Sequence, residues 1–363
     1  MYLLYGRVID VIHGEVIENG MVVTDGERIV YAGAEGGFRV PADADVRVIE
    51  VEDGTILPGL IDAHAHLSGC ESVNRTGNTP YELLLTVVHD IGELVDAGIT
   101  GVRDMSVFGY PLMKAIEKGN IRGPRIMPGG RVIGSTGGHS DPGPELSPAE
   151  VNEKDLTSYL ADGREGCLRA VRTQFREGAR FIKICATGGV SSQMDGVEDI
   201  QFSLEEMEVM VQEAKRHGTY VAAHCTGLEG ARQALRAGVT SIEHGIRLDE
   251  ECVRLMVQND ATLVTTLSVA FGIKNFTGLP DYLVEKALAV EKYIRDSYVL
   301  AHRAGVRVAL GSDYSNSRNT PYSKIGREFE ALTQVGYSNI EAIQAGTIHG
   351  AHLMKLEDQT GSL

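Results

Sequence analysis

The chain has 363 residues, of which 43% are hydrophobic and 23% charged, as is typical of a soluble globular protein with one large domain or two ordinary ones. Its 34 basic and 50 acidic residues give a net charge of −16, and no lysine–arginine cluster offsets it, so we expect neither nucleic acid nor a membrane surface as a partner. The chain contains no run of 18 apolar residues, so we expect no membrane-spanning helix.

The N-terminus and the cysteines favour a cytoplasmic location. Residues 1–10 lack the basic start and the long apolar core of a signal peptide, and they predict a first strand instead. The five cysteines are not arranged as C-x-x-C pairs, which argues against a disulfide framework and against a thiolate zinc site. They are Cys70, Cys167, Cys185, Cys225 and Cys252.

The first 55 residues predict a small β domain. Short β-branched runs in this segment are separated by turn sequences, and helical periodicity does not begin until about residue 80. The predicted turns are Asn19-Gly20, Asp25-Gly26 and Glu35-Gly36-Gly37.

From there the chain repeats a pattern of helix, glycine and β-branched run. Thr79-Pro80 begins an amphipathic stretch over residues 81–97, which Gly98 ends before a short strand. Capping-box spacing predicts the start of two further helices, at Asp162 with Glu165 and at Ser203 with Glu206.

Eight strands can be counted within residues 56–350. They cover residues 56–66, 99–103, 125–132, 181–185, 220–224, 241–244, 262–266 and 306–310. Alternating strands and helices with right-handed crossovers give a parallel sheet, and eight repeats predict an α/β fold of the (β/α)8 TIM-barrel type. An open, doubly wound sheet is the alternative, disfavoured because no G-x-G-x-x-G follows a strand.

Polar side chains stand at the carboxyl ends of these strands, where a (β/α)8 barrel carries its chemistry. In chain order they are His64, His66, Arg103, Lys183, His224, His244 and Asp313. His64 and His66 point to the same face of a strand, which suits two imidazoles that bind one metal ion. Each of these residues alone has a simpler structural interpretation, as a core histidine, a barrel lysine or a helix cap. Their convergence on one barrel mouth favours a metal site.

The order of the H-x-H pair, the lysine, the two later histidines and the aspartate resembles that of the amidohydrolase superfamily, and the resemblance covers nearly the whole chain. Three stretches resemble the branch that contains metal-dependent Xaa-Pro (prolidase) and Xaa-Arg/Lys dipeptidases, with imidazolonepropionase-like enzymes as more distant relatives. They are residues 134–139, 182–190 and 243–245. The resemblance implies a barrel over residues 56–350, with residues 351–363 starting a return to the β domain. Relatives continue from there into strands that complete a sandwich, so we expect the C-terminal half of that sandwich to be missing from this sequence.

The resemblance also implies two divalent metal ions, with zinc as the first choice and manganese, cobalt or iron as alternatives. The ligands would be His64, His66 and Asp313 for one ion and His224 and His244 for the other, bridged by a CO2-derived carbamate on Lys183. A hydroxide shared by the ions would attack an amide carbonyl, and Asp313 would pass its proton to the leaving amine. The expected reaction is hydrolysis of a C–N bond.

Loops at the predicted mouth offer substrate contacts. His139, in the glycine-rich loop 134–148, is expected to act on the substrate carbonyl or carboxylate, as a histidine does in the related dipeptidases; a flexible connector is the alternative. Arg103 is a candidate anion anchor, although a structural ion pair is as common. Thr226 stands where relatives that bind an α-carboxylate carry tyrosine, which leaves room for substrates without that group.

We therefore expect a metal-dependent hydrolase of an amide or peptide-like bond, with a dipeptidase of the prolidase type as the first choice and a dipeptide or other small molecule as substrate. Another amide, a carbamate or a cyclic amide is the alternative substrate, as is a deaminase reaction. A catalytically silent relative is a remote alternative. The resemblance further implies a homo-oligomer.

Overall fold

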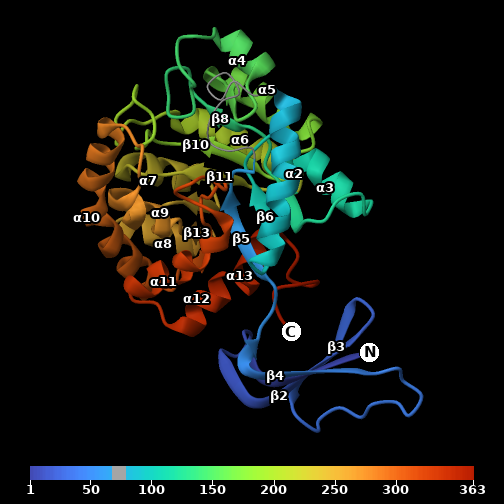
Figure 1. Cartoon of the computed structure of the whole chain (residues 1–363). Helices are drawn as coiled ribbons and strands as arrows, with labels where there is room; N and C mark the ends of the chain where they lie inside the picture. The colour runs from blue at the N-terminus through green and yellow to red at the C-terminus, as the bar shows by residue number, and fades with distance from the viewer. Residues whose placement is uncertain (68–78) are drawn as a thin grey trace.

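The computed structural model describes residues 1–67 and 79–363, and it consists of a small β unit beside a larger α/β unit (Figure 1). Cys70 of the sequence analysis lies outside the described residues. The other four cysteines are free and buried, in line with the predicted absence of a disulfide framework in this part of the chain. No helix in the described ranges has both the length and the apolar character needed to cross a bilayer.

The small unit is a four-stranded sheet in the order β3-β2-β1-β4, with β1 and β4 parallel and the other pairs antiparallel. Its strands are β1 (Tyr2–Asp10), β2 (Glu15–Asp25), β3 (Arg28–Ala34) and β4 (Arg47–Ile56). The predicted turn at Asp25-Gly26 is confirmed, with Gly26 at φ 58°. The turn predicted at Asn19-Gly20 is wrong because β2 runs straight through it. A Cβ added to Gly20 would lie 2.5 Å from a methyl carbon of Val8, so this glycine provides space rather than a turn.

The larger unit is built on parallel strands that form a seven-stranded and a three-stranded sheet, in the orders β14-β13-β12-β11-β10-β8-β9 and β5-β6-β7. The strands are β5 (Leu60–Ala65), β6 (Ile99–Asp104), β7 (Arg125–Pro128), β8 (Val132–Gly134), β9 (Ser158–Leu160), β10 (Ile182–Cys185), β11 (Val221–His224), β12 (Ser241–Glu243), β13 (Thr262–Val264) and β14 (Arg307–Ala309).

All eight predicted strands are present in this unit, but the third is divided into β7 and β8. The break falls at Gly129-Gly130. Gly130 has a φ of 70°, and a Cβ on Gly129 would lie 2.5 Å from the ring of Phe181. Glycine is required here by both conformation and space, and the strand cannot continue through it.

Helices alternate with these strands and pack around them (Figure 1). They are α2 (Pro80–Asp96), α3 (Gly109–Glu117), α4 (Pro148–Lys154), α5 (Gly163–Arg176), α6 (Leu204–Arg216), α7 (Leu228–Arg236), α8 (Glu250–Gln258), α9 (Leu267–Gly272), η1 (Ile273–Asn275), α10 (Asp281–Arg303), η2 (Tyr322–Lys324), α11 (Gly326–Gln334), α12 (Asn339–Ala345) and α13 (Ile348–Leu353).

Two helix starts test the predicted capping boxes. Ser203 and Glu206 form the box at the start of α6, as expected. Asp162 is the N-cap residue of α5, so the predicted helix start is confirmed, but its side chain makes no capping hydrogen bond and the capping box does not form. Its carboxylate instead accepts hydrogen bonds from the backbone N–H and the hydroxyl of Thr136, at 3.1 and 2.6 Å.

Backbone hydrogen bonds join the two parallel sheets where β5 meets the chain around β14. Ala63 N donates to Leu310 O (2.8 Å), and Asp313 N donates to His64 O (2.7 Å). On the other side, Arg180 N donates to Pro128 O (2.6 Å) and links the end of β7 to the segment before β10. The carboxyl ends of β5 and β14 therefore lie together, and the residues that follow them converge.

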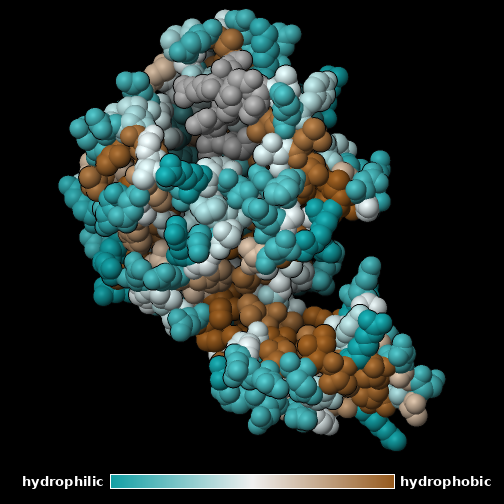
Figure 2. Space-filling model, in the orientation of Figure 1, coloured by the Kyte–Doolittle hydropathy of each residue, from teal (hydrophilic) through white to brown (hydrophobic). Residues whose placement is uncertain are grey.

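The small unit meets the larger one through α12, where the Gln344 side chain donates to Val11 O (2.8 Å). Apolar residues gather on the visible surface of the small unit (Figure 2), and several of its large apolar side chains are exposed. They include Tyr2, Val16, Ile29, Val30, Val48 and Ile49.

Candidate metal centre and active-site cavity

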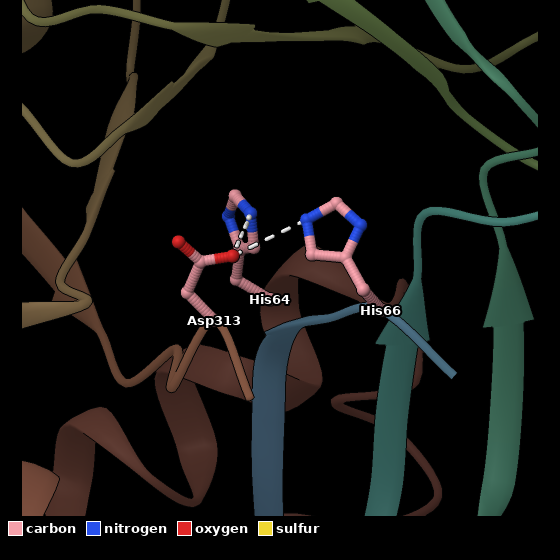
Figure 3. Close-up of side chains that lie close together, drawn as sticks. All are labelled: His64, His66 and Asp313. Carbon is pink, nitrogen blue, oxygen red and sulfur yellow. Dashed lines mark ion pairs between the residues drawn. The ribbon is translucent and has the colours of Figure 1, made fainter. Parts of the chain in front are cut away.

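His64, His66 and Asp313 form a compact cluster at the adjoining ends of β5 and β14 (Figure 3). One Asp313 carboxylate oxygen lies 3.2 Å from His66 Nε2 and 3.5 Å from His64 Nε2. One ligand atom from each residue lies within 4.8 Å of the other two. Two imidazole nitrogens and a carboxylate at this spacing can bind a single divalent ion.

His64 is fully buried, and its two ring nitrogens have different surroundings. Nδ1 lies 2.6 Å from a Glu243 carboxylate oxygen, while Nε2 is buried without a hydrogen-bond partner among the described residues. Burial, helped by the charge of Lys183, lowers the pKa of His64 to about 4, so the ring is neutral near pH 7. A neutral ring that donates from Nδ1 presents an Nε2 lone pair to the cluster, which fits a bound cation.

Arg103 does not reach the cavity, so its predicted role as an anion anchor is wrong and the structural ion pair is confirmed. Its guanidinium is fully buried and contacts both carboxylate oxygens of Glu243, at 2.8 and 3.0 Å. It also donates to Ala63 O (2.6 Å) and to the hydroxyl groups of Tyr220 and Ser241 (3.1 Å each). All the N–H groups of the Arg103 guanidinium therefore donate to acceptors inside the protein.

Glu243 was not among the predicted site residues. Burial alone would raise its pKa, but Arg103 and His64 hold the pKa of this carboxyl well below its usual range. The ionised carboxylate thus connects Arg103 to His64 and fixes the orientation of the imidazole. A signal was available: in the strand Ser241-Ile242-Glu243, two polar residues flank an apolar one and therefore point to the same face.

Lys183, His224 and His244 line the same cavity as the cluster, so the structure brings all six predicted metal ligands together. The ring centroids of His224 and His244 are 4.6 Å apart, and that of His244 is 5.0 Å from His64. Lys183, in β10, is almost fully buried, and burial lowers its pKa. No hydrogen bond or ion pair connects its ammonium to any residue in 1–67 or 79–363.

Three residues around the cluster have a left-handed backbone. They are His244 (φ 69°), Thr266 (φ 64°) and Asp313 (φ 59°), each following a strand of the seven-stranded sheet. A non-glycine residue in this region costs about 1–3 kcal/mol, and such residues concentrate at functional sites. The hydroxyl of Thr266 lies 2.8 Å from His244 Nδ1, so the side chains of two of these three residues are hydrogen-bonded to each other.

A cavity of about 1120 Å³ opens from the cluster. The predicted mouth loop 134–148 contributes residues 139–145 to its lining, and the loop after β10 contributes residues 190–194. His139 stacks on His224 with ring centroids 4.3 Å apart, and its Nδ1 lies 3.4 Å from a carboxylate oxygen of Asp195. The structure therefore brings His139 to the cavity beside a predicted ligand, which is where a substrate contact would have to lie.

Lys286, from α10, holds the loop that carries Asp195. Its ammonium donates to Gly189 O (3.0 Å) and Ser192 O (2.6 Å) and lies 3.2 Å from the Asp195 carboxylate. Burial would raise the pKa of Asp195, but His139 and Lys286 hold it below its usual value. The cation on α10 thus fixes the loop, and through Asp195 it orients the His139 ring.

Residues 55–363 match the profile described as the amidohydrolase family. The chain belongs to this family. Ochratoxinase of Aspergillus niger is 32% identical, over 92% of this chain and 72% of its own length. A crystal structure of a prolidase complexed with N-methylphosphonate-L-proline has a TM-score of 0.88 and 32% identity, over 100% of this chain and 89% of its own. Imidazolonepropionase of Hyphomonas neptunium is 24% identical, over 96% of this chain and 86% of its own.

These similarities confirm the predicted branch, with imidazolonepropionase more distant than the prolidase. The chain is a hydrolase that acts on carbon–nitrogen bonds. It is a metal-dependent amidohydrolase, and its His64, His66 and Asp313 form a candidate metal site.

The amidohydrolase uses the Thr226 hydroxyl internally. It donates to Gly188 O, and it lies 3.0 Å from Val197 O and 3.0 Å from the hydroxyl of Thr187. The side chain lines the cavity but is almost fully buried, and it ties the loop after β10 to the end of β11. Contact between Thr226 and a substrate stays a prediction.

Replacing Lys286 by methionine should lower kcat/KM by up to about 100-fold, because a small displacement of a substrate-positioning group can cost that much. The variant removes the cation that holds the 189–195 loop while keeping the length of the side chain. Steady-state kinetics and thermal unfolding should be measured together. Lys292→Met on the same helix is the matched control, since Lys292 is exposed and lies over the ring of Tyr293. Equal losses in both variants would contradict a specific role for Lys286.

Glu328 holds the start of α9, which begins directly after Thr266. Its carboxyl oxygens accept from Leu267 N and Ser268 N, both at 2.7 Å, and the side chain is fully buried. Burial raises the pKa of Glu328 to about 7. The folded protein therefore keeps this proton up to neutral pH, whereas the unfolded chain releases it near the ordinary value of 4.5.

The free energy of unfolding should consequently fall as pH rises from about 4.5 to 7, by at most about 1.4 kcal/mol per pH unit from this group. In Glu328→Gln this contribution is absent. Urea unfolding of both proteins at several pH values isolates it as a difference. A difference in unfolding free energy that does not change across this range would show that Glu328 is ionised throughout.

Proposed function

We propose that this amidohydrolase cleaves the amide bond between an acyl or aminoacyl group and an amino acid, as a prolidase-like dipeptidase would, with two divalent ions at the centre. The convergence of His64, His66 and Asp313 at the end of the cavity carries the proposal, together with the buried Nε2 of His64, which has no hydrogen-bond partner among the described residues. The similarity to a prolidase and to ochratoxinase supports it.

The six cavity residues divide into two ligand sets. His64, His66 and Asp313 would hold one ion, and His224 and His244 the other. Lys183 would bridge them as a carbamate formed with CO2. Its lowered pKa supports this, because only the neutral amine reacts with CO2 and burial raises the neutral fraction. Zinc is the proposed metal, and the same donors also suit manganese, cobalt or iron.

Ions bound there would polarise the substrate carbonyl and lower the pKa of a bound water molecule to about 7. The protein's own contribution is proton transfer and positioning. Burial would raise the pKa of Asp313, but the neighbouring His64, His66 and His244 hold it well below its usual value. The carboxylate is thus ionised and able to accept a proton and return it to the leaving nitrogen. His139, oriented by Asp195, would donate a hydrogen bond to the substrate carbonyl or carboxylate.

Metal content and substrate turnover test this proposal together. Purified protein should contain two equivalents of divalent metal and should hydrolyse members of a panel of Xaa-Pro and other dipeptides and N-acyl amino acids. Incubation with ¹³C-bicarbonate should give a carbamate resonance on the lysine. A protein that holds two metal ions and hydrolyses only a cyclic amide would support the imidazolonepropionase-like alternative. A fully metallated protein that cleaves nothing in either set would overturn the proposal.

We further propose that the two parallel sheets are parts of one closed (β/α)8 barrel. The backbone bonds between β5 and the segment around β14, and between residue 128 and residue 180, support closure. The exposed apolar side chains of the four-stranded sheet support a second layer over it, to which residues 351–363 would lead.

A further inference from the structure

We propose that α9, η1 and α10 form a subsite for a large apolar acyl group, so that the preferred substrates are amino acids N-acylated with a long aliphatic or an aromatic acid. This inference rests on the proposed function and specifies the substrate class of the same site. It goes beyond a general dipeptidase because most dipeptides would leave the subsite unfilled.

The wall that these three elements present to the cavity carries no charged side chain. Its lining residues between 267 and 303 are apolar except for Tyr282, which donates to Ser191 O (3.1 Å). Residues that form the wall include Val269, Ala270, Ile273, Phe276, Ala287 and Val290. An apolar surface of this kind favours alkyl and aryl groups and disfavours charged ones, because a charge there would lose its hydration without gaining a partner.

The apolar wall begins next to the metal centre. Helix α9 starts immediately after Thr266, whose hydroxyl contacts His244. Ile246, two residues beyond His244, also lines the cavity. A group that enters this subsite is therefore attached close to the bond that is cleaved.

The polar part of the lining comes from the loops after β8 and β10. It includes His139, Ser140, Ser191 and Ser192. The second of these loops contacts α10, where Tyr282 donates to Ser191 O and Lys286 to Ser192 O. A substrate with one apolar and one polar end is favoured in the orientation that places each end against the matching part of the lining. Its acyl chain packs on α9 and α10, and its amino acid part, with the carboxylate, faces the His139 side.

The size of the cavity supports an acyl group larger than an ordinary side chain. Ligand pockets typically measure about 300–1,000 Å³, and this one has about 1120 Å³. An acetyl group would fill only a small part of the apolar wall. Each additional methylene group buried there should increase affinity.

The test compares N-octanoyl, N-benzoyl and N-acetyl derivatives of the amino acid that is cleaved fastest in the panel. With the metal-loaded wild-type protein, kcat/KM should be at least about tenfold higher for the octanoyl and benzoyl compounds than for the acetyl compound, the discrimination that a hydrophobic pocket provides. In Ala287→Phe, which fills the subsite, this ratio should collapse. Ala270→Phe tests the same wall from α9 if the first variant does not fold. Leu288→Phe, at an exposed position of α10, should leave the ratio unchanged.

Equal kcat/KM for the acetyl and octanoyl compounds would overturn the subsite while the proposed function stands. So would a cavity-filling variant that folds and keeps the wild-type ratio. A preference that follows the size of the amino acid rather than the acyl group would also overturn it. Failure of the wild-type protein to cleave any dipeptide or N-acyl amino acid would instead remove the proposed function, and the subsite with it.

Discussion

Replacing Asp313 by asparagine is expected to lower kcat by at least about 100-fold, the lower end of what a positioned general base contributes. The carboxylate lies 3.2 Å from His66 and 3.5 Å from His64, and its pKa is held well below the usual range by the histidines around it. An amide at this position keeps the shape of the side chain but cannot accept the proton, and it is a weaker metal ligand.

Asparagine is the informative replacement because of the backbone. Asp313 has a φ of 59°, a left-handed conformation that most residues tolerate poorly and that asparagine adopts readily. Asp313→Asn should therefore fold like the wild-type protein, and the thermal unfolding of the metal-free proteins should coincide. Metal content, measured by elemental analysis, separates loss of an ion from loss of proton transfer at full occupancy.

Asp260→Asn is the matched control. Asp260 also has a left-handed backbone (φ 52°), but its side chain is 71% exposed and pairs with Arg307 outside the cavity. This variant should keep wild-type kcat and metal content. Full activity of Asp313→Asn, with the wild-type metal content retained, would exclude a role of Asp313 in proton transfer.

Much of the fold follows from local patterns in the sequence. The repeated pattern of helix, glycine and strand predicts the parallel strands. The residues that meet in the cavity are predicted by the H-x-H pair together with the later lysine, histidines and aspartate. Each of these signals depends on a short segment and on one rule, that the carboxyl ends of parallel strands lie at the same edge of a sheet. Strand ends are less certain from sequence, because the glycine pair that divides the third strand could also lie within a strand, and the close approach of Phe181 to Gly129 is visible only in the structure.

The supporting contacts of the site could not be predicted in this way. Arg103 and Glu243 are 140 residues apart, and Lys286 is 91 residues from Asp195. Nothing in the segment around Arg103 indicates whether its guanidinium faces the cavity or a buried carboxylate, since both require an arginine at the end of an apolar strand. The orientation of the guanidinium depends on its partner, Glu243, and the sequence does not show that the two residues lie together until the sheets are assembled.

The Arg103–Glu243 pair gives the largest expected effect on stability. Replacing Arg103 by leucine should lower the free energy of unfolding by about 3–5 kcal/mol, because it leaves a fully buried carboxylate without its counter-charge. Chemical denaturation of the metal-free protein measures the loss. Arg122→Leu, which removes an exposed ion pair with Asp96, is the control and should show no measurable change.

A double variant separates the stability of this pair from its action on the metal site. With Arg103→Met and Glu243→Leu together no buried charge is left unpaired, so most of the stability lost in Arg103→Leu should return. Metal affinity should nevertheless stay about 10–100-fold below that of the wild-type protein, because His64 Nδ1 no longer has the acceptor at 2.6 Å that orients the ring.

The two readouts can fail independently. If the double variant stays as unstable as Arg103→Leu, the stability derives from the bonds of Arg103 to Ala63, Tyr220 and Ser241 rather than from charge compensation. If metal affinity returns along with stability, Glu243 does not orient His64. Stability without metal affinity is the result that the geometry predicts, since the carboxylate serves Arg103 on one side and His64 on the other.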